Sequence, residues 1–183
     1  MKAGRRPVVA VVGSARVEDE QLRAQLHDLG GALMSAGFRL VTGGLSGTME
    51  AVSAGARASE DWEDGRVIGV VPSYRHSEAN EYCDIVIPTG QQVGRNLLVV
   101  ATAHVVVAVG GGAGTLSEIA LAWQLKRPIV TMGDSGWAGR VAGERLDARL
   151  EQPIHAANSV AEVVEACIRL WPTVADATDI RAH

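Results

Sequence analysis

Short apolar runs alternate with amphipathic stretches along most of the chain. The runs are rich in valine and isoleucine and are largely unbroken, a pattern typical of strands that are buried on both faces of a sheet. They predict strands at Val8–Val12, Phe38–Thr42, Arg66–Val71, Asp84–Pro88, Val105–Val109, Pro128–Met132 and Pro153–Ala156. The stretches between them predict helices at Glu20–Ala36, Met49–Ala58, Gln91–Ala103, Thr115–Leu125, Glu144–Leu150 and Ser159–Trp171.

Strands that alternate with helices predict an α/β fold, a single Rossmann-like domain in which a doubly wound parallel sheet is flanked by helices. No boundary or repeat interrupts the pattern, so we expect one domain over residues 1–183, with a frayed tail over about 173–183. The composition of three further segments is typical of irregular structure. We expect an exposed loop at Ser59–Gly65, a loop that covers the ligand site at Tyr74–Tyr82, and a loop or broken helix at Gly133–Gly143.

Composition excludes several classes of protein. The net charge of −4 argues against nucleic acid as a partner, since such binding needs a basic face. No apolar run reaches the roughly 18 residues that a membrane-spanning helix requires. Cys83 and Cys167 lie far apart and the histidines show no metal spacing, so neither a disulfide nor a metal site is expected. These features predict a cytoplasmic protein that binds neither nucleic acid nor a membrane.

The most informative stretch is a glycine-rich turn between the run Val105–Val109 and the helix that begins at Thr115. Such a turn brings the backbone close to a ligand, and the free N–H groups and dipole of the following helix favour an anion. The turn lacks the lysine of a Walker A loop and the last glycine of a GxGxxG dinucleotide motif. We expect phosphate to bind at Gly111, Gly112, Ala113, Gly114 and Thr115.

The same turn has a purely structural alternative. Thr115 and Glu118 have the spacing of a capping box, in which the glutamate only bonds the backbone at the helix start. Ser159 and Glu162 have the same spacing. Against this alternative, each of the adjacent glycines costs conformational entropy on folding, which favours a turn that is kept for a ligand.

Two further glycine turns follow predicted strands. Gly13 and Ser14 come after the first strand, and Gly43 and Gly44 come after the second. In a doubly wound sheet the ligand lies at the carboxyl ends of the strands, where the strand order reverses. Because all three turns fall at carboxyl ends, we include these four residues in the expected binding site.

Two charged residues lie close to these turns in the predicted fold. Arg95 falls in the first turn of a predicted helix, where a cation opposes the helix dipole. It is therefore either a solvated side chain or the partner of an anionic ligand or a carboxylate in the cleft. Glu118 follows the glycine turn, so its carboxylate would stand near the group that carries the phosphate. Glu50 has a comparable place after the second turn, where a cap or a surface role is equally consistent.

Together these motifs resemble the Lonely Guy (LOG) family, once labelled lysine decarboxylases. Residues 111–118, Gly-Gly-Ala-Gly-Thr-Leu-Ser-Glu, match its GGxGTxxE motif. The segment Gly43–Met49 resembles its upstream glycine segment, and Arg95 falls where the family has its arginine. Within the family, the motifs are most similar to the branch that holds molybdenum cofactor carrier proteins. Val109-Gly110 departs from typical LOG enzymes, which have Leu-Pro at this place.

The resemblance implies a homo-oligomer, a homodimer or homotetramer, that binds a small phosphorylated ligand. In the carrier branch the cargo is the molybdenum cofactor (molybdopterin), a pterin that ends in a phosphate. LOG enzymes instead cleave the N-glycosidic bond of a nucleoside 5′-monophosphate, with Arg95 and Glu118 as the implied catalytic residues and no cofactor required. A cofactor carrier is the leading interpretation, a phosphoribohydrolase is the alternative, and a nucleotide-sensing module without catalysis stays open.

Overall fold

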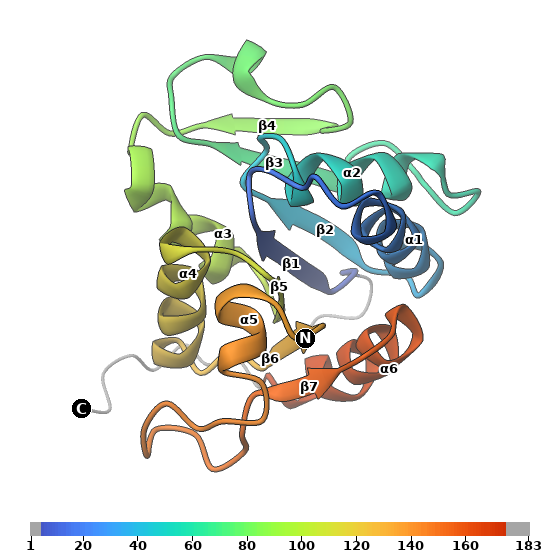
Figure 1. The fold of residues 1–183 in the computed structure, drawn as a ribbon. Coiled ribbons are helices and arrows are strands. Elements are labelled where there is room, and N and C mark those ends of the chain that lie inside the picture. Colours follow the sequence, from blue (N-terminus) through green and yellow to red (C-terminus); the bar gives the residue numbers. More distant parts are fainter. Residues whose placement is uncertain (1–4, 175–183) are drawn as a thin grey trace.

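The computed structural model of the protein describes residues 5–174. Within these residues, seven strands form one parallel sheet (Figure 1). They are β1 (Val8–Gly13), β2 (Arg39–Thr42), β3 (Val67–Val71), β4 (Ile85–Pro88), β5 (Val105–Val109), β6 (Ile129–Met132) and β7 (His155–Ala157). Their order is β4-β3-β2-β1-β5-β6-β7. The order reverses beside β1, which confirms the predicted doubly wound α/β fold.

Helices cover both faces of the sheet (Figure 1). One face carries α1 (Glu20–Ser35), α2 (Thr48–Ala58) and α6 (Val160–Leu170), and the other carries α3 (Asn96–Thr102), α4 (Ala113–Gln124) and α5 (Gly136–Arg140). The part of the chain that the structure describes also has three short 3-10 helices, η1 (His76–Glu78), η2 (Gln92–Arg95) and η3 (Trp171–Thr173). None of the helices within residues 5–174 is long and apolar enough to span a bilayer.

The central strand β1 shows why the apolar runs are unbroken. Val9 and Val11 belong to the core cluster that includes the buried residues of α1, α2 and α6. Ala10 and Val12 belong to the cluster that includes those of α3 and α4. Because each face of the strand is covered by a helical layer, every position along it is apolar.

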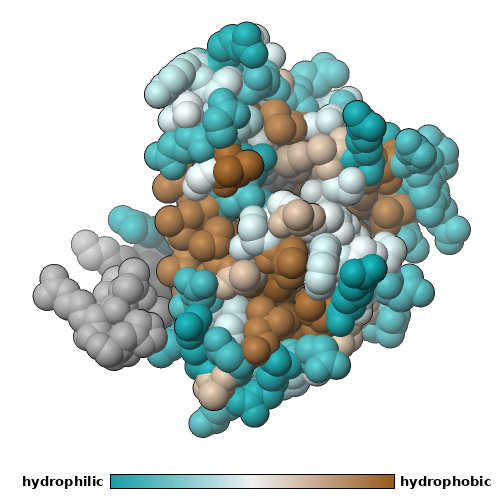
Figure 2. Space-filling model, turned by 60° about the vertical axis from the view of Figure 1, so that its left-hand side comes forward, coloured by the Kyte–Doolittle hydropathy of each residue, from teal (hydrophilic) through white to brown (hydrophobic). Residues whose placement is uncertain are grey.

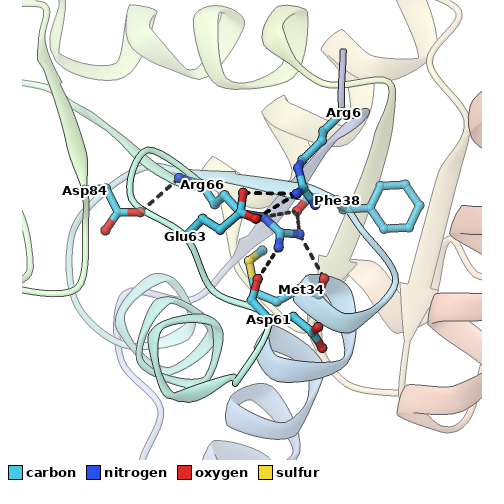
Figure 3. Close-up of polar contacts among 7 residues, drawn as sticks. All are labelled: Arg6, Met34, Phe38, Asp61, Glu63, Arg66 and Asp84. Carbon is cyan, nitrogen blue, oxygen red and sulfur yellow. Dashed lines mark hydrogen bonds and ion pairs between the residues drawn. The ribbon is translucent and has the colours of Figure 1, made fainter. Parts of the chain in front are cut away.

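A buried arginine holds the end of the sheet that lies away from the glycine turns. Arg66, the predicted first residue of the third strand, lies one residue before β3 and is 2% exposed. Its guanidinium donates to the carbonyl oxygens of Met34, Phe38 and Asp61, while its backbone N–H donates to Asp84 Oδ2 at 3.0 Å (Figure 3). These bonds tie the end of α1 to the starts of β3 and β4.

Two predicted helices differ in the structure. Residues 144–150 form an irregular loop in place of a helix, because polar contacts such as the bond from Trp123 Nε1 to Asp147 Oδ1 replace helical bonds there. Gln91–Ala103 is divided into η2 and α3, and Gln92, the first residue of η2, has a left-handed φ of +51° that an α-helix cannot contain. That residues 1–183 form one domain stays a prediction, and the predicted tail lies outside the described residues from 175 onward.

Candidate functional site

A cavity of about 420 Å³ lies at the carboxyl ends of the central strands, where the strand order reverses. The turns after β1, β2 and β5 and the segment η2–α3 contribute its walls. The predicted site residues that line it are Gly13, Ser14, Gly43, Arg95, Gly112, Gly114, Thr115 and Glu118. The structure therefore brings all three glycine turns and both charged residues to one cavity.

The glycine turn before α4 is fixed by its backbone conformation and by α5. Gly110 and Gly111 have φ values of +57° and +81°, in the left-handed region that favours glycine. A Cβ on Gly111 would overlap the side chain of Thr115. The carbonyl oxygens of Gly110 and Gly111 accept bonds of 3.0 Å from Ala138 and Trp137 at the start of α5. The turn is thus held before any ligand arrives.

The first turn of α4 presents its backbone N–H groups without a side-chain cap from the described residues. Gly112 is the N-cap residue, and the first helical bond runs from Leu116 N to Gly112 O at 3.0 Å. The N–H groups of Ala113, Gly114 and Thr115 precede that bond, so they have no carbonyl partner within the helix. A Cβ on Gly112 or Gly114 would meet no atom within 4 Å, so the space in front of these groups is open.

The capping-box alternative for Thr115 is wrong. The helix begins at Ala113, so Thr115 is its third residue and cannot be the N-cap, and Glu118 turns toward Arg95. At the second predicted box only the serine half forms, because Ser159 Oγ accepts from Glu162 N at 3.2 Å while Glu162 Oε2 accepts from Asn158 N at 2.8 Å. The helix start at α4 therefore differs from that at α6, because no side chain of the described residues caps it.

The turn after β2 is built differently from the turn before α4. Thr48, the first residue of α2, donates its N–H to Ser14 O at 2.9 Å, so the backbone of the β1 turn already occupies this helix start. Ser46 Oγ donates to Ala15 O at 2.9 Å. These bonds fasten the β1 and β2 turns to each other, so the start of α2 is not open in the way that the start of α4 is.

Arg95 and Glu118 face each other in the cavity wall. Arg95 Nη1 lies 3.5 Å from Glu118 Oε1, and the two side chains are 9% and 8% exposed. Arg95 is the N-cap residue of α3, and its Nε is buried without a hydrogen-bond partner among the described residues. A Cβ on Gly43 would overlap this guanidinium, which explains the glycine at that place. Arg95 thus lines the cavity and has a buried donor that the described residues leave without a partner.

A chain of hydrogen bonds links this pair to the glycine turn. Arg95 Nη1 donates to Asn96 Oδ1 at 2.9 Å, and Asn96 Nδ2 donates to Ser117 Oγ at 2.9 Å. Ser117 Oγ in turn donates to Gly114 O at 2.6 Å. The orientation of the guanidinium is therefore coupled to the backbone that would hold an anion.

Burial dominates the electrostatics of the pair. It raises the pKa of Glu118 to about 7, although the nearby Arg95 charge lowers it. Burial also lowers the pKa of Arg95, and the Glu118 charge opposes this shift. A carboxyl group with a pKa near 7 can hold or release a proton at neutral pH, which is the property of a general acid or base.

The raised pKa of Glu118 predicts a pH-dependent stability. The folded protein holds a proton up to about pH 7 that the unfolded chain releases near the ordinary value of 4.5. The free energy of unfolding should therefore fall as the pH rises through this window, by about 3 kcal/mol, and level off above it. Urea unfolding at pH 5 and pH 8 should show this difference in the wild type but not in Glu118→Gln. An equal pH difference in both proteins would contradict the assignment.

Similarity to known proteins shows the family to which this chain belongs. The model of the SLOG cluster4 family matches residues 6–164. The chain belongs to the SLOG cluster4 family. This LOG-like family and the carrier proteins described next confirm the resemblance drawn from the sequence, including the branch of molybdenum cofactor carriers.

Relatives of this SLOG cluster4 protein include solved structures of similar length. The molybdenum cofactor binding protein of Rippkaea orientalis is 31% identical with a TM-score of 0.78, over 91% of this chain and 98% of that one. The molybdenum cofactor carrier protein of Chlamydomonas reinhardtii is 32% identical with a TM-score of 0.75, over 91% and 99%. An uncharacterized protein of Archaeoglobus fulgidus is 33% identical over 132 residues, 68% of this chain and 83% of the relative.

Some predicted residues of the SLOG cluster4 protein do not line the cavity. Gly44 packs against β3, and its carbonyl accepts from Asn80 N at 2.8 Å. Gly111 and Ala113 shape the turn but are absent from the cavity wall. The segment 74–82, predicted to cover the site, does not line it either, and Asn80 binds the β2 turn from outside.

Other lining residues are missed by the sequence patterns. They come from β2–α2, from the end of β3 and from η2–α3, and are Leu45, Met49, Pro72, Gln92, Val93 and Asn96. Gln92 combines a left-handed φ of +51° with a place in the wall, a combination typical of functional sites. Only a structure shows this conformation. Among the described residues, no group of three His, Cys, Asp or Glu side chains could hold a metal ion.

Proposed function

We propose that this protein binds the molybdenum cofactor as a carrier, with the phosphate of the pterin at the first turn of α4. The proposal rests on two features of one cavity. The backbone N–H groups at the start of α4 have no side-chain cap, and Arg95, in the same wall, has a buried donor without a partner among the described residues. Both features attract an anion, and each is left without a partner by the described residues. Similarity to cofactor-binding proteins over 91% of the chain supports the identity of the ligand.

The cavity fits a ligand of this class. Its volume of about 420 Å³ lies in the range of roughly 300–1000 Å³ that is usual for small-molecule sites. Gly112, Gly114 and Thr115 would hold the phosphate, and Arg95 would add a charged donor. Met49 and Val93 provide apolar surface in the same wall for a flat heterocycle. The molybdenum would be part of the cargo.

A LOG-type phosphoribohydrolase is the second candidate. The observation that favours it is the Arg95–Glu118 pair, with a carboxyl pKa of about 7 beside the expected phosphate site. In that reaction Glu118 would activate water or stabilise positive charge on the ribose, and Arg95 would orient the sugar and the carboxylate. The same donors at α4 would hold the 5′-phosphate.

The carrier proposal is tested by retention of the cofactor. Molybdenum cofactor released from a molybdoenzyme is mixed with the protein, free cofactor is removed by gel filtration, and the bound pterin is measured after oxidation to its fluorescent form. We expect about one pterin for each chain and little in Arg95→Ala, which removes the buried donor. Absence of pterin from the wild-type fraction would contradict the proposal.

We also propose that the chain forms a homodimer or homotetramer in the cytoplasm. Both cysteines are free thiols, which is consistent with a reducing compartment. Three large apolar side chains beside the cavity are exposed: Val93 by 84%, Leu97 by 43% and Leu98 by 37%. Figure 2 shows hydrophobic patches on the face of the molecule that is turned forward there. Exposed patches of this kind often mark interfaces.

Leu97→Glu should weaken this assembly. A carboxylate buried between two copies of α3 would be desolvated without a partner. Light scattering after gel filtration should give two or four times the chain mass of 19.2 kDa for the wild type and one chain for the variant. Ile168→Glu is the matched control, because Ile168 is 49% exposed on α6, away from the cavity. A monomeric wild type would contradict the proposal.

A further inference from the structure

A second and larger cavity lies at the opposite edge of the sheet. Its volume is about 840 Å³. Pro128 and Ile129 line it at the amino end of β6, and Ile154 and His155 line it at the amino end of β7. The glycine turns lie at the carboxyl ends of the strands, so the two cavities are separate sites.

The wall of this cavity is built by the loop between α5 and β7. Gly143 N donates to Ile154 O at 3.0 Å, and Ile154 N donates to Glu144 O at 2.9 Å, so backbone bonds close the base of the loop. Trp123 Nε1 donates to Asp147 Oδ1 at 2.7 Å, which ties the loop to α4. The cavity is therefore formed by the folded chain before a ligand binds, as is usual for small-molecule sites.

The lining is apolar with basic groups. Trp123, Ile129, Leu150 and Leu170 supply apolar surface, and the charged residues in the wall are lysine and arginine. Among the described residues that line the cavity there is no aspartate or glutamate. Such a lining accepts a molecule with an apolar body and a negative charge.

The two cations, Lys126 and Arg169, are available to a ligand. Within residues 5–174 neither forms an ion pair with a carboxylate, although Arg6, Arg57 and Arg95 each do. Arg169 Nη2 instead lies 3.3 Å from His155 Nε2, which leaves the positive charge of the arginine uncompensated.

The backbone at Lys126 adds an independent observation. Lys126 follows α4 with a left-handed φ of +53°, a place where helices usually carry glycine. A non-glycine residue in this conformation is mildly unfavourable, and such residues are enriched at functional sites. Lysine at this place puts an ammonium group at the wall of the cavity.

We propose that this cavity binds an amphipathic carboxylate, a molecule with one negative head and an aliphatic body. The head lies against Lys126 and Arg169, and the body fills the apolar space between Trp123 and Leu170. The proposal does not depend on the function proposed for the first cavity, because no residue is shared between the two linings.

Decanoate is the probe, titrated into the full chain by isothermal calorimetry. We expect one binding site in the wild type and affinity at least about tenfold lower in the double variant Lys126→Gly/Arg169→Gln. Glycine suits the left-handed backbone at position 126, so this change should not unfold the protein. Decanol, which has the same chain length without the charge, should bind equally weakly to both proteins. Gly112→Asp, at the other cavity, should leave decanoate binding unchanged.

Two results would overturn the proposal. One is the absence of decanoate binding at concentrations up to about 1 mM, and the other is equal affinity in the wild type and the double variant. A separate arm tests the chain itself as the occupant, because residues 175–183 continue directly from Val174, which lines the cavity. Ile180 is the large aliphatic residue of that segment. If decanoate bound to Ile180→Asp but not to the wild type, residues 175–183 would be the occupant of the cavity, and the proposal would be overturned.

Discussion

Gly112→Asp is expected to abolish binding of the phosphorylated ligand without unfolding the protein. Gly112 is the N-cap residue of α4 with a φ of −104°, and a Cβ there would meet no atom within 4 Å. An aspartate therefore fits, and its carboxylate can cap the free N–H groups. It then competes with the phosphate for the same donors and repels it. We expect a loss of affinity of at least about a hundredfold, which is about 3 kcal/mol.

Two control variants separate the charge from the cap. Gly112→Asn has the same shape and can also cap the helix, but it lacks the negative charge, so its affinity should be intermediate. Gly112→Ala adds no polar group and should bind nearly as the wild type does. Binding is measured by pterin retention, and the fold is checked by urea unfolding, in which Gly112→Asp should be at least as stable as the wild type. Cofactor binding by Gly112→Asp at wild-type affinity would contradict the account.

The Gly111 position gives the opposite expectation for stability. Its φ is +81°, and a Cβ would overlap Thr115, so even alanine is strained there. The two neighbouring glycines are therefore needed for different reasons. Glycine at position 111 is required by the backbone conformation, whereas glycine at position 112 leaves the N–H groups at the helix start uncapped. A better cap at Gly112 would stabilise the helix but would block the anion site.

Glu118→Gln separates the carrier from the hydrolase. In a hydrolase Glu118 acts on the ribose in the transition state, so its loss should lower turnover by about a hundredfold or more while binding persists. In a carrier, glutamine retains much of the polar contact, and cofactor binding should change by only a few-fold. Because we propose a carrier, we expect the variant to retain the cofactor and the wild type to release no base from AMP.

The measurement is release of free base from AMP and other nucleoside monophosphates, by wild type and Glu118→Gln side by side. Arg95→Lys is a useful companion, since it keeps a positive charge but loses the planar guanidinium that contacts Asn96 and Glu118. Turnover in the wild type that disappears in Glu118→Gln would replace the carrier with the hydrolase. Turnover that is equal in both would argue that a contaminating enzyme is present.

The fold and much of the site could be predicted from local pattern. Unbroken valine runs such as Val105–Val109 are buried on both faces, and this burial is what the pattern reports. The glycine turns follow from chain order, because parallel strands bring their carboxyl ends to one edge. The prediction of a helix at Glu144–Leu150 is wrong, because tertiary contacts of this segment with Trp123 and Ile154 override its local helix propensity.

Other parts of the site depend on conformations that the residue type does not reveal. Gln92 adopts a left-handed backbone although glycine stands nearby at position 94, so residue type does not reveal that the predicted α-helix cannot begin there. Asn96 and Ser117 connect through side chains that are 21 residues apart in sequence. Gly43 and Gly44 are adjacent residues of the same type, yet only Gly43 lines the cavity, because Gly44 packs against β3.

In the proposed carrier, a phosphorylated heterocycle is bound at the first turn of α4. The most direct test is a native mass spectrum of protein freshly purified from cells that make the molybdenum cofactor, with Gly112→Asp prepared in parallel. We expect wild-type chains with an added mass equal to that of the cofactor, and Gly112→Asp at the mass of the bare polypeptide. Wild-type protein at the bare mass, even after incubation with excess cofactor, would contradict it.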